Sequence, residues 1–264
     1  MVSIHSGAAI AKNLFAQVTP FGMVSLRLGL GALILLVLNR PQWRHHTWKD
    51  YRLLGLLGLS VGVMNTLLYH AIAYIPIGVA VTLEFVGPLG VALAHSRRSV
   101  DLLWVALAAA GVCLLAPFGD IALNPLGVVL ALMAGGCWAA YIILCAQVSK
   151  IFSGGEGLAM AMTMGAIVIL PFGIAAEGSH LLLPSILLLG LGVAVLSSVF
   201  PYSLEMAALR HLPVKVFGVF MSLEPAVASL IGLLILGETL SLRMVVAIAL
   251  VSSASAGSAM QPVK

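Results

Sequence analysis

Charged residues are scarce in this sequence. They make up 8% of its 264 residues, while 61% are hydrophobic, and the mean hydropathy is +1.14. A soluble globular protein carries about 25% charged residues. A folded water-soluble domain could not bury this much apolar surface, so the composition predicts a chain whose solvent is lipid. Ten spans of about 20 residues would leave only short connections, which excludes a separate soluble domain.

Motifs for catalysis and for cofactor binding are also missing. The sequence contains no serine elbow, no HExxH pattern and no phosphate-binding loop, which argues against an enzyme and against ATP use. Cys113, Cys137 and Cys145 lack the paired spacing of a metal site or a disulfide framework. The net charge of +4 is spread over short loops, so nucleic acid is excluded as a partner. We expect no metal and no cofactor.

Ten apolar segments follow one another along the chain. They predict an all-α polytopic membrane protein with ten transmembrane helices. The first segment is short, so we expect either that the natural chain begins further upstream or that this helix crosses only part of the bilayer. The eighth is long, and Pro201 is expected to kink it. The segments cover residues 4–18, 21–38, 53–74, 77–95, 102–118, 126–148, 157–176, 182–209, 216–236 and 242–259.

The Lys and Arg residues outside these segments lie almost entirely on one side. Cytoplasmic loops of membrane proteins carry an excess of Lys and Arg. Only Arg243 falls on the side that follows odd-numbered segments. We therefore expect both termini in the cytoplasm and the protein in the inner (plasma) membrane. The residues on the other side are Arg40, Arg44, Lys49, Arg52, Arg97, Arg98, Lys150, Arg210, Lys215 and Lys264.

The two halves of the chain resemble each other when they are offset by 140 positions. Residues 78–84 (Gly-Val-Ala-Val-Thr-Leu-Glu) then align with residues 218–224 (Gly-Val-Phe-Met-Ser-Leu-Glu). This offset predicts one repeat over residues 1–118 and a second over residues 124–260. Because five spans are an odd number, the second copy enters the membrane from the other side. Secondary transporters with such inverted repeats bind substrates near the midplane, where the repeats meet.

Within this repeated motif, Glu84 and Glu224 are the residues whose insertion into a bilayer costs the most free energy. A charged side chain at the centre of a bilayer costs on the order of 2.5–3.5 kcal/mol on insertion scales. Each could be a protonated, hydrogen-bonded glutamic acid with a structural role only. The functional interpretation is stronger, because ionisable residues inside a membrane usually serve a transport path. Such a carboxylate can hold a substrate ammonium or carry a coupling proton.

Other polar residues inside the segments are weaker candidates. Arg27 lies deep enough to pair with a carboxylate of the protein or of a substrate, whereas Lys12 could extend to the interface. Glu205 lies near the cytoplasmic end of its segment and could pair with Arg210. Most membrane aromatics pack or anchor at the interface. The remaining candidates for a substrate or proton pathway are Asn65, Tyr69, Tyr141 and Tyr202.

Several runs resemble a known family. Two five-helix repeats, and the Leu-Gly-Glu-Thr-Leu turn at residues 236–240, resemble tandem EamA-type domains of the drug/metabolite transporter superfamily. The first half departs from that turn with Ser-Arg-Arg-Ser at residues 96–99. Within the superfamily, the chain resembles the threonine/homoserine exporter branch. The matching runs are residues 79–89, 96–98, 201–206 (Pro-Tyr-Ser-Leu-Glu-Met) and 221–226.

This resemblance implies the efflux of small neutral amino acids such as threonine and homoserine, driven by the proton gradient. Export of drugs or of other small metabolites by the same fold is the alternative. A passive channel and a membrane-embedded enzyme are further rivals, and the enzyme would need a nucleophile–base pair or a metal cluster. The sequence leaves the oligomeric state open, with a homodimer as one form.

Overall fold

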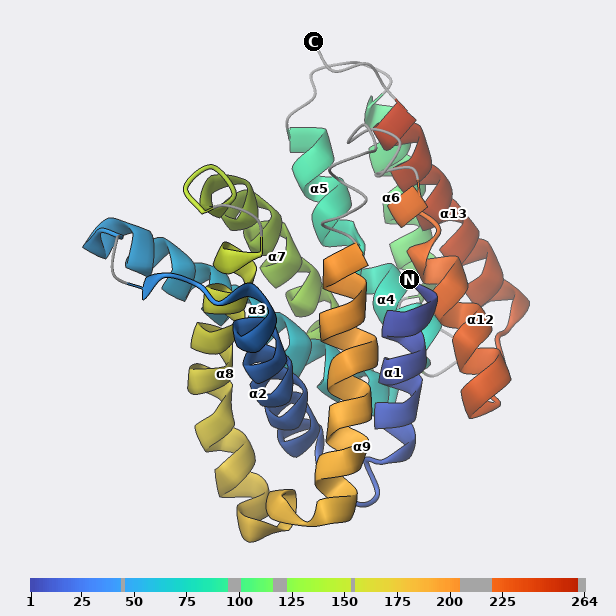
Figure 1. Ribbon diagram of the computed structural model, residues 1–264. Coiled ribbons are helices and arrows are strands. Elements are labelled where there is room, and N and C mark those ends of the chain that lie inside the picture. The colour runs from blue at the N-terminus through green and yellow to red at the C-terminus, as the bar shows by residue number, and fades with distance from the viewer. Residues whose placement is uncertain (44–45, 95–100, 116–122, 153–154, 205–219, 261–264) are drawn as a thin grey trace.

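The computed structural model of the chain describes residues 1–43, 46–94, 101–115, 123–152, 155–204 and 220–260. Every regular element in these ranges is helical, so the all-α prediction is confirmed (Figure 1). The elements are α1 (Val2–Asn13), α2 (Pro20–Asn39), α3 (Trp48–Tyr74), α4 (Ile77–Glu84), α5 (Val86–Ala94), α6 (Asp101–Leu115), α7 (Pro125–Val148), α8 (Glu156–Glu177), η2 (Gly178–Leu182), α9 (Pro184–Ala194), η3 (Val195–Val199), α12 (Glu224–Leu236) and α13 (Leu242–Met260).

Six helical stretches are long and apolar enough to cross a membrane by length and composition. Their outward surface is apolar, with Val37 and Leu188 each 70% exposed. Such a surface suits contact with lipid better than contact with water. The six stretches are Pro20–Asn39, Trp48–Tyr74, Pro125–Val148, Glu156–Leu182, Pro184–Leu204 and Leu242–Met260, and shorter apolar helices cover Ile77–Val91, Leu103–Leu115 and Glu224–Leu236.

Local signals in the sequence set the starts of three long helices. The Thr47 side chain accepts a hydrogen bond from the Asp50 N–H, and the Asp50 carboxylate accepts one from the Thr47 N–H, so α3 begins with a capping box. Thr19 caps α2 by accepting a hydrogen bond from the Gly22 N–H, and a proline follows it in the first turn. Asn124 caps α7 and is also followed by proline, which has no N–H that a helix start would leave unpaired.

The predicted segment 77–95 is interrupted where a continuous helix was expected. Helix α4 ends at Glu84 and α5 begins at Val86, with Phe85 between them. Pro88 explains the break, because it lacks the N–H that would otherwise bond to the Glu84 carbonyl oxygen. The predicted segment 216–236 is also interrupted among its described residues, since a turn precedes α12, which starts at Glu224 with proline at position 225.

The eighth predicted segment departs from α-helical geometry just upstream of Pro201. Helix α9 passes into a π-helical stretch, η3, which spans Val195–Val199 before helical geometry resumes as far as Leu204. A proline cannot supply the α-helical hydrogen bond to the carbonyl four residues earlier, here that of Ser197. Single π turns of this kind are frequent at functional sites.

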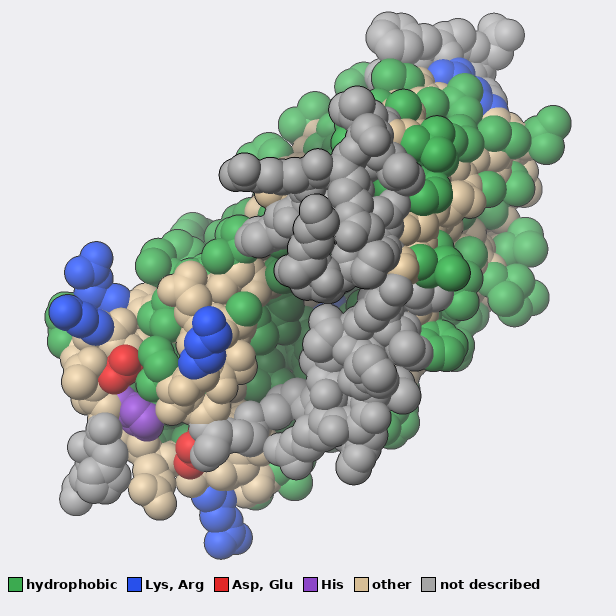
Figure 2. Space-filling model, turned by 90° about the horizontal axis from the view of Figure 1, so that it is seen from above, with side chains coloured by type: hydrophobic (Ala, Val, Ile, Leu, Met, Phe, Trp, Pro, Cys, Tyr) green, Lys and Arg blue, Asp and Glu red, His purple; other side chains and the backbone are tan. Residues whose placement is uncertain are grey.

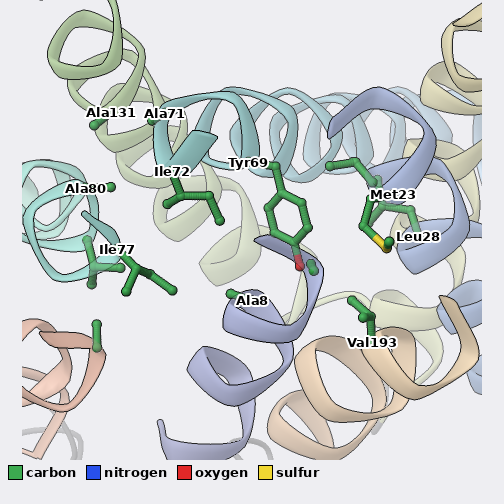
Figure 3. Packing of buried hydrophobic residues seen from close by; sticks show 14 of the residues in the cluster. Ala8, Met23, Leu28, Tyr69, Ala71, Ile72, Ile77, Ala80, Ala131 and Val193 are labelled. Carbon is green, nitrogen blue, oxygen red and sulfur yellow. The ribbon is translucent and has the colours of Figure 1, made fainter. Parts of the chain in front are cut away.

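Helices distant in sequence pack side by side. Helix α3 runs along α7 and α8, α2 along α8, and α13 along α6, while α1 lies against α12, α9 and η3 (Figure 1). The crossing of α3 and α8 is tight, because a Cβ at Gly58 would lie 2.5 Å from the Ala161 carbonyl oxygen. Small residues permit such close approach in membranes. The largest side chains of the core include Tyr69, whose ring points from α3 toward α1 beside Ala8 (Figure 3).

Some sequence predictions fall on parts of the chain that the structure does not describe. These are Glu205, residues 218–219 of the repeat motif, and the Ser-Arg-Arg run at residues 96–98. Helix α1, the first predicted segment, has 12 residues. At 1.5 Å per residue it is about 18 Å long, which is shorter than the roughly 30 Å hydrocarbon core of a bilayer.

Candidate functional site

A cavity of about 80 Å³ lies between the helices near the middle of the molecule. Pockets that bury drug-sized ligands measure roughly 300–1,000 Å³, so in this conformation only a small molecule would fit. The walls combine apolar side chains with ionisable ones. They are formed by Ile4, His5, Ala8, Arg27, Met64, Asn65, Leu68, Ile72, Ile77, Val81, Glu84, Trp138, Tyr141, Tyr202, Met221 and Glu224.

Glu84 reaches the cavity from the break between α4 and α5. Its side chain is buried, with the residue 4% exposed. Its backbone carbonyl faces Gly135 of α7, where a Cβ would lie 2.6 Å from the carbonyl oxygen. Gly87, just after the break, abuts the Gly135 backbone as well. The break is therefore held against a glycine surface of α7, and this contact fixes the position from which the carboxylate extends.

Glu224 enters the cavity from the first residue of α12 and is 5% exposed. Its Oε1 lies 3.3 Å from Nε2 of His5 on α1. His5 Nε2 and the other carboxylate oxygen, Glu224 Oε2, are both buried and have no hydrogen-bond partner among the described residues. Buried polar atoms are nearly always paired in native structures. These two are therefore available to a ligand or a proton.

Arg27 on α2 brings a positive charge to the same cavity and is 2% exposed. Its Nη2 donates to the Ser197 carbonyl oxygen at 2.7 Å, and its Nε donates to Ser198 Oγ at 3.0 Å. Its guanidinium carbon lies 5.3 Å from the centre of the Tyr69 ring, which is close enough for a cation–π contact. These two hydrogen bonds use two of the five N–H donors of a guanidinium.

Three other predicted candidates also line the cavity. Asn65 is buried on α3, and its Nδ2 donates to the Val61 carbonyl oxygen at 2.8 Å. The amide oxygen of Asn65 can therefore face the cavity as an acceptor. Tyr141 on α7 and Tyr202 beyond η3 add aromatic walls. The structure thus gathers Arg27 and both glutamates with these three residues around one cavity.

Tyr69 has a different place from that predicted. It is fully buried behind Arg27 and is not one of the lining residues. Its hydroxyl has no hydrogen-bond partner among the described residues, and the close view shows it directed toward α1 (Figure 3). Tyr69 therefore supports the guanidinium of Arg27 from outside the cavity. Glu205 lies outside the described residues.

The arrangement can bind a small molecule that carries both signs of charge. Two carboxylates suit an ammonium group, and a guanidinium whose bonds to Ser197 and Ser198 use two of its five donors suits a carboxylate. The apolar side chains around them keep water out and strengthen these contacts. Among the described residues, no group of three or more His, Cys, Asp or Glu side chains could hold a metal ion.

A second polar cluster lies at one end of α1 and α4. Lys12 Nζ is 2.6 Å from Glu238 Oε1 and donates to the Ile75 carbonyl oxygen at 3.0 Å. Glu238 in turn accepts the N–H of Ile77, at 3.0 Å to Oε2. Sequence reasoning gave Lys12 no partner, because Glu238 is 226 positions away. Glu238 was visible only as part of the Leu-Gly-Glu turn.

Sequence reasoning also missed the contacts that hold the central charges. His5 stood in an apolar run with nothing to mark its contact with Glu224. Ser197 and Ser198 looked like ordinary small residues of a transmembrane helix. The one available signal was Pro201, which leaves the Ser197 carbonyl without its α-helical donor.

Comparison with known proteins identifies the family. The EamA-like transporter family pattern matches residues 125–259. The chain is also 48% identical over 98% of its length to the threonine/homoserine exporter RhtA of Salmonella typhimurium strain LT2, covering 88% of that protein. For the protein of the same name from Escherichia coli K12 the identity is 45% with the same coverage. The chain belongs to the EamA-like transporter family.

This EamA-like transporter also shares its fold with a solved crystal structure. The two superpose with a TM-score of 0.65 at 17% identity, over 98% of this chain and 93% of the other. The resemblance drawn from the residue runs is confirmed by the family and by the relatives. The protein is accordingly a multi-pass membrane transporter and not an enzyme.

Proposed function

We propose that this EamA-like transporter exports small neutral amino acids, with threonine and homoserine as the expected substrates. The observation that carries the proposal is the gathering of Arg27, Glu84 and Glu224 around one buried cavity. Amino acids at neutral pH carry an ammonium and a carboxylate, which match these charges. The relatives at 45–48% identity, which are named threonine/homoserine exporters, support this substrate class.

In this proposal the carboxylates receive the ammonium and Arg27 receives the carboxylate of the substrate. Glu224 is the main anchor for the ammonium in this proposal, since its buried Oε2 has no hydrogen-bond partner among the described residues. Asn65 and the aromatic walls contact the side chain. Because the cavity is small, the site has to widen when an amino acid enters.

Ten membrane spans in two inverted repeats, residues 1–118 and 124–260, form the framework of the proposal. The match to the EamA-like family over residues 125–259 supports the second unit. The breaks next to Glu84 and Glu224 support the repeat, because transporters of this type place discontinuous helices at the midplane site. Alternating access then takes place by rocking one repeat against the other.

In this proposal the protein lies in the inner membrane of the cell, with both of its termini in the cytoplasm. Figure 2, which views the end at the top of Figure 1, shows most of its visible Lys and Arg side chains gathered at the left of that face. Arg40, Lys49, Arg52 and Lys150 are all exposed. An excess of Lys and Arg marks cytoplasmic loops. The turn that carries Glu238 then faces the outside.

Proton antiport drives the export in this scheme. A proton entering from outside neutralises Glu84 or Glu224 after the amino acid has left, and this allows the emptied site to return inward. A buried carboxylate that alternates between a proton and an ammonium is enough for such exchange. No cofactor takes part in this cycle.

The test is amino-acid flux from proteoliposomes that contain the purified protein. Vesicles loaded with labelled threonine or homoserine are placed in a pH gradient, and flux is compared with vesicles lacking a gradient and with unlabelled competitors. Gradient-dependent flux of these two amino acids is expected. Amino-acid flux that does not depend on the pH gradient would indicate a channel. Flux of drugs or other metabolites, without flux of amino acids, would overturn the substrate assignment.

A further inference from the structure

We infer that Lys12 and Glu238 are positioning residues that close one end of the transport path, where they link the end of α1 to the start of α4. The inference deepens the proposed function and rests on it for the meaning of the path. It starts from the second polar cluster, in which Lys12 lies on α1, whose other end contacts Glu224, and Glu238 lies in the turn after α12. Lys12 and Glu238 are partly buried, with side chains 22% and 12% exposed.

The position of Glu238 is fixed by its own turn. Gly237 adopts a left-handed conformation at φ 64°, which glycine reaches without steric cost. The Glu238 N–H then bonds back to the Gly232 carbonyl oxygen at 3.1 Å. This closed turn folds the carboxylate back beside Gly232 of α12, where it also meets the start of α4 at Ile77. The Leu-Gly-Glu run therefore builds a rigid support for one acidic side chain.

Helix α1 connects the cluster with the central site. Ile4, His5 and Ala8 line the cavity, and Lys12 continues the same face one turn further along. His5 and Lys12 are seven residues apart, which is about 10.5 Å along the axis. One end of this short helix contacts Glu224, and the other is bound to Glu238.

Helix α4 makes a parallel connection. Ile77, Val81 and Glu84 line the cavity along one face. The first of these donates its N–H to Glu238, and the last is the carboxylate at the break. An anion at a helix start is favoured by the helix dipole. The two lining faces thus end at the same ion pair, at the ends remote from the central carboxylates.

The consequence is mechanical. Opening the cavity at this end requires α1 to leave α4, and this separates Lys12 from Glu238. A substrate ammonium at Glu224 contacts the carboxylate that His5 faces, so binding acts on the other end of the same helix. Lys12 and Glu238 therefore set which side of the cavity is open without touching the substrate.

The inference is tested by labelling a single cysteine in the cavity. Leu68→Cys is placed in a chain whose three native cysteines are replaced by serine, and a membrane-impermeant maleimide is added to vesicles of known orientation. Glu238→Gln keeps an oxygen for the Ile77 N–H but removes the ion pair, and Lys12→Met removes it from the other side. Either change is expected to raise labelling from the Glu238 face by about fivefold or more.

Two further variants separate closure from general loosening. Lys12→Arg restores a positive charge and is expected to label like the parent. Glu177→Gln serves as the matched control, because Glu177 also accepts a backbone N–H, that of Thr19 at 2.6 Å, and contacts His180, yet touches neither α1 nor α4 in these contacts. Its labelling is expected to remain at the parent level.

Unchanged labelling in both Glu238→Gln and Lys12→Met, with folding verified by thermal unfolding, would overturn the inference. An equal rise in Glu177→Gln would overturn it as well, because the effect would then be a loosening of the whole face. The labelling needs no substrate. A failure to transport amino acids would therefore count against the proposed function while leaving this result readable.

Discussion

Arg27 donates a hydrogen bond to the backbone carbonyl of Ser197, across 170 positions of sequence and at 2.7 Å. The carbonyl is one that Pro201 cannot bond within an α-helix. A buried cation thus finds its acceptor in a proline-distorted stretch of a neighbouring helix. This relationship places the guanidinium at the cavity wall and leaves other donors for a ligand.

Pro201→Ala supplies an N–H that can compete for the Ser197 carbonyl oxygen. We expect amino-acid flux to fall by about threefold to tenfold, since one hydrogen bond to a charged group is weakened. The melting temperature should not fall, because alanine favours a helix. Flux in proteoliposomes and thermal unfolding in detergent measure the two effects. Pro184→Ala is the control. That proline is at the start of α9, where its missing N–H costs the helix no hydrogen bond. Equal effects at both prolines would contradict the prediction.

Glu84→Gln and Glu224→Gln each keep side-chain volume and remove the titratable group. We expect either change to lower gradient-driven flux by tenfold or more, on the order expected for losing a buried charge contact to the substrate. Counterflow of labelled against unlabelled amino acid without a gradient shows whether binding survives. Full gradient-driven flux in both variants would remove the two carboxylates from the mechanism.

His5 can be tested with two substitutions of opposite character. His5→Leu removes the side chain that faces Glu224 at 3.3 Å, so a buried carboxylate loses its neighbour and flux should fall by about tenfold. His5→Gln retains an N–H donor of similar reach and should stay near the parent. If leucine and glutamine behave alike, the contact between His5 and Glu224 does not matter for transport.

The glycine contact at the break gives a prediction on stability alone. In Gly135→Ala the new methyl group meets the Glu84 carbonyl oxygen at 2.6 Å, and such crowding should destabilise the protein by about 1–3 kcal/mol. Gly136→Ala on the same helix meets nothing within 4 Å and should be neutral or slightly stabilising. The measurement is the melting temperature of each of the two variants in the same detergent. Equal melting temperatures would contradict the packing described for α7.

The sequence was most informative where a residue was out of place for its surroundings. Glu84, Glu224 and Arg27 stood out because a charge in an apolar run is costly, and the structure gathers all three around one cavity. Runs of apolar residues located the helical segments. The hidden features were those made by tertiary contact, such as His5 beside Glu224 and Lys12 beside Glu238. Neither spacing nor composition encodes such pairs.

The interruption at Phe85 was missed for a different reason. Apart from Glu84 the residues on both sides of Phe85 are apolar, so residues 77–95 were predicted as one uninterrupted helix. Pro88 was present in the sequence, but prolines are tolerated inside transmembrane helices, and one alone does not predict a break. The approach of Gly135 to the Glu84 carbonyl is a contact between helices. Together with Pro88, it accounts for the break.

The contact of Gly87 and Gly135 has a mechanical meaning. At this point two backbones meet with no side chain of these residues between them. Side chains that interlock must be pulled apart before their helices can turn, whereas bare backbones can pivot in place. Under the proposed alternating access, residues beside such a pivot would move least. Glu84 is next to it, so we expect this carboxylate to stay nearly still while the ends of the helices move.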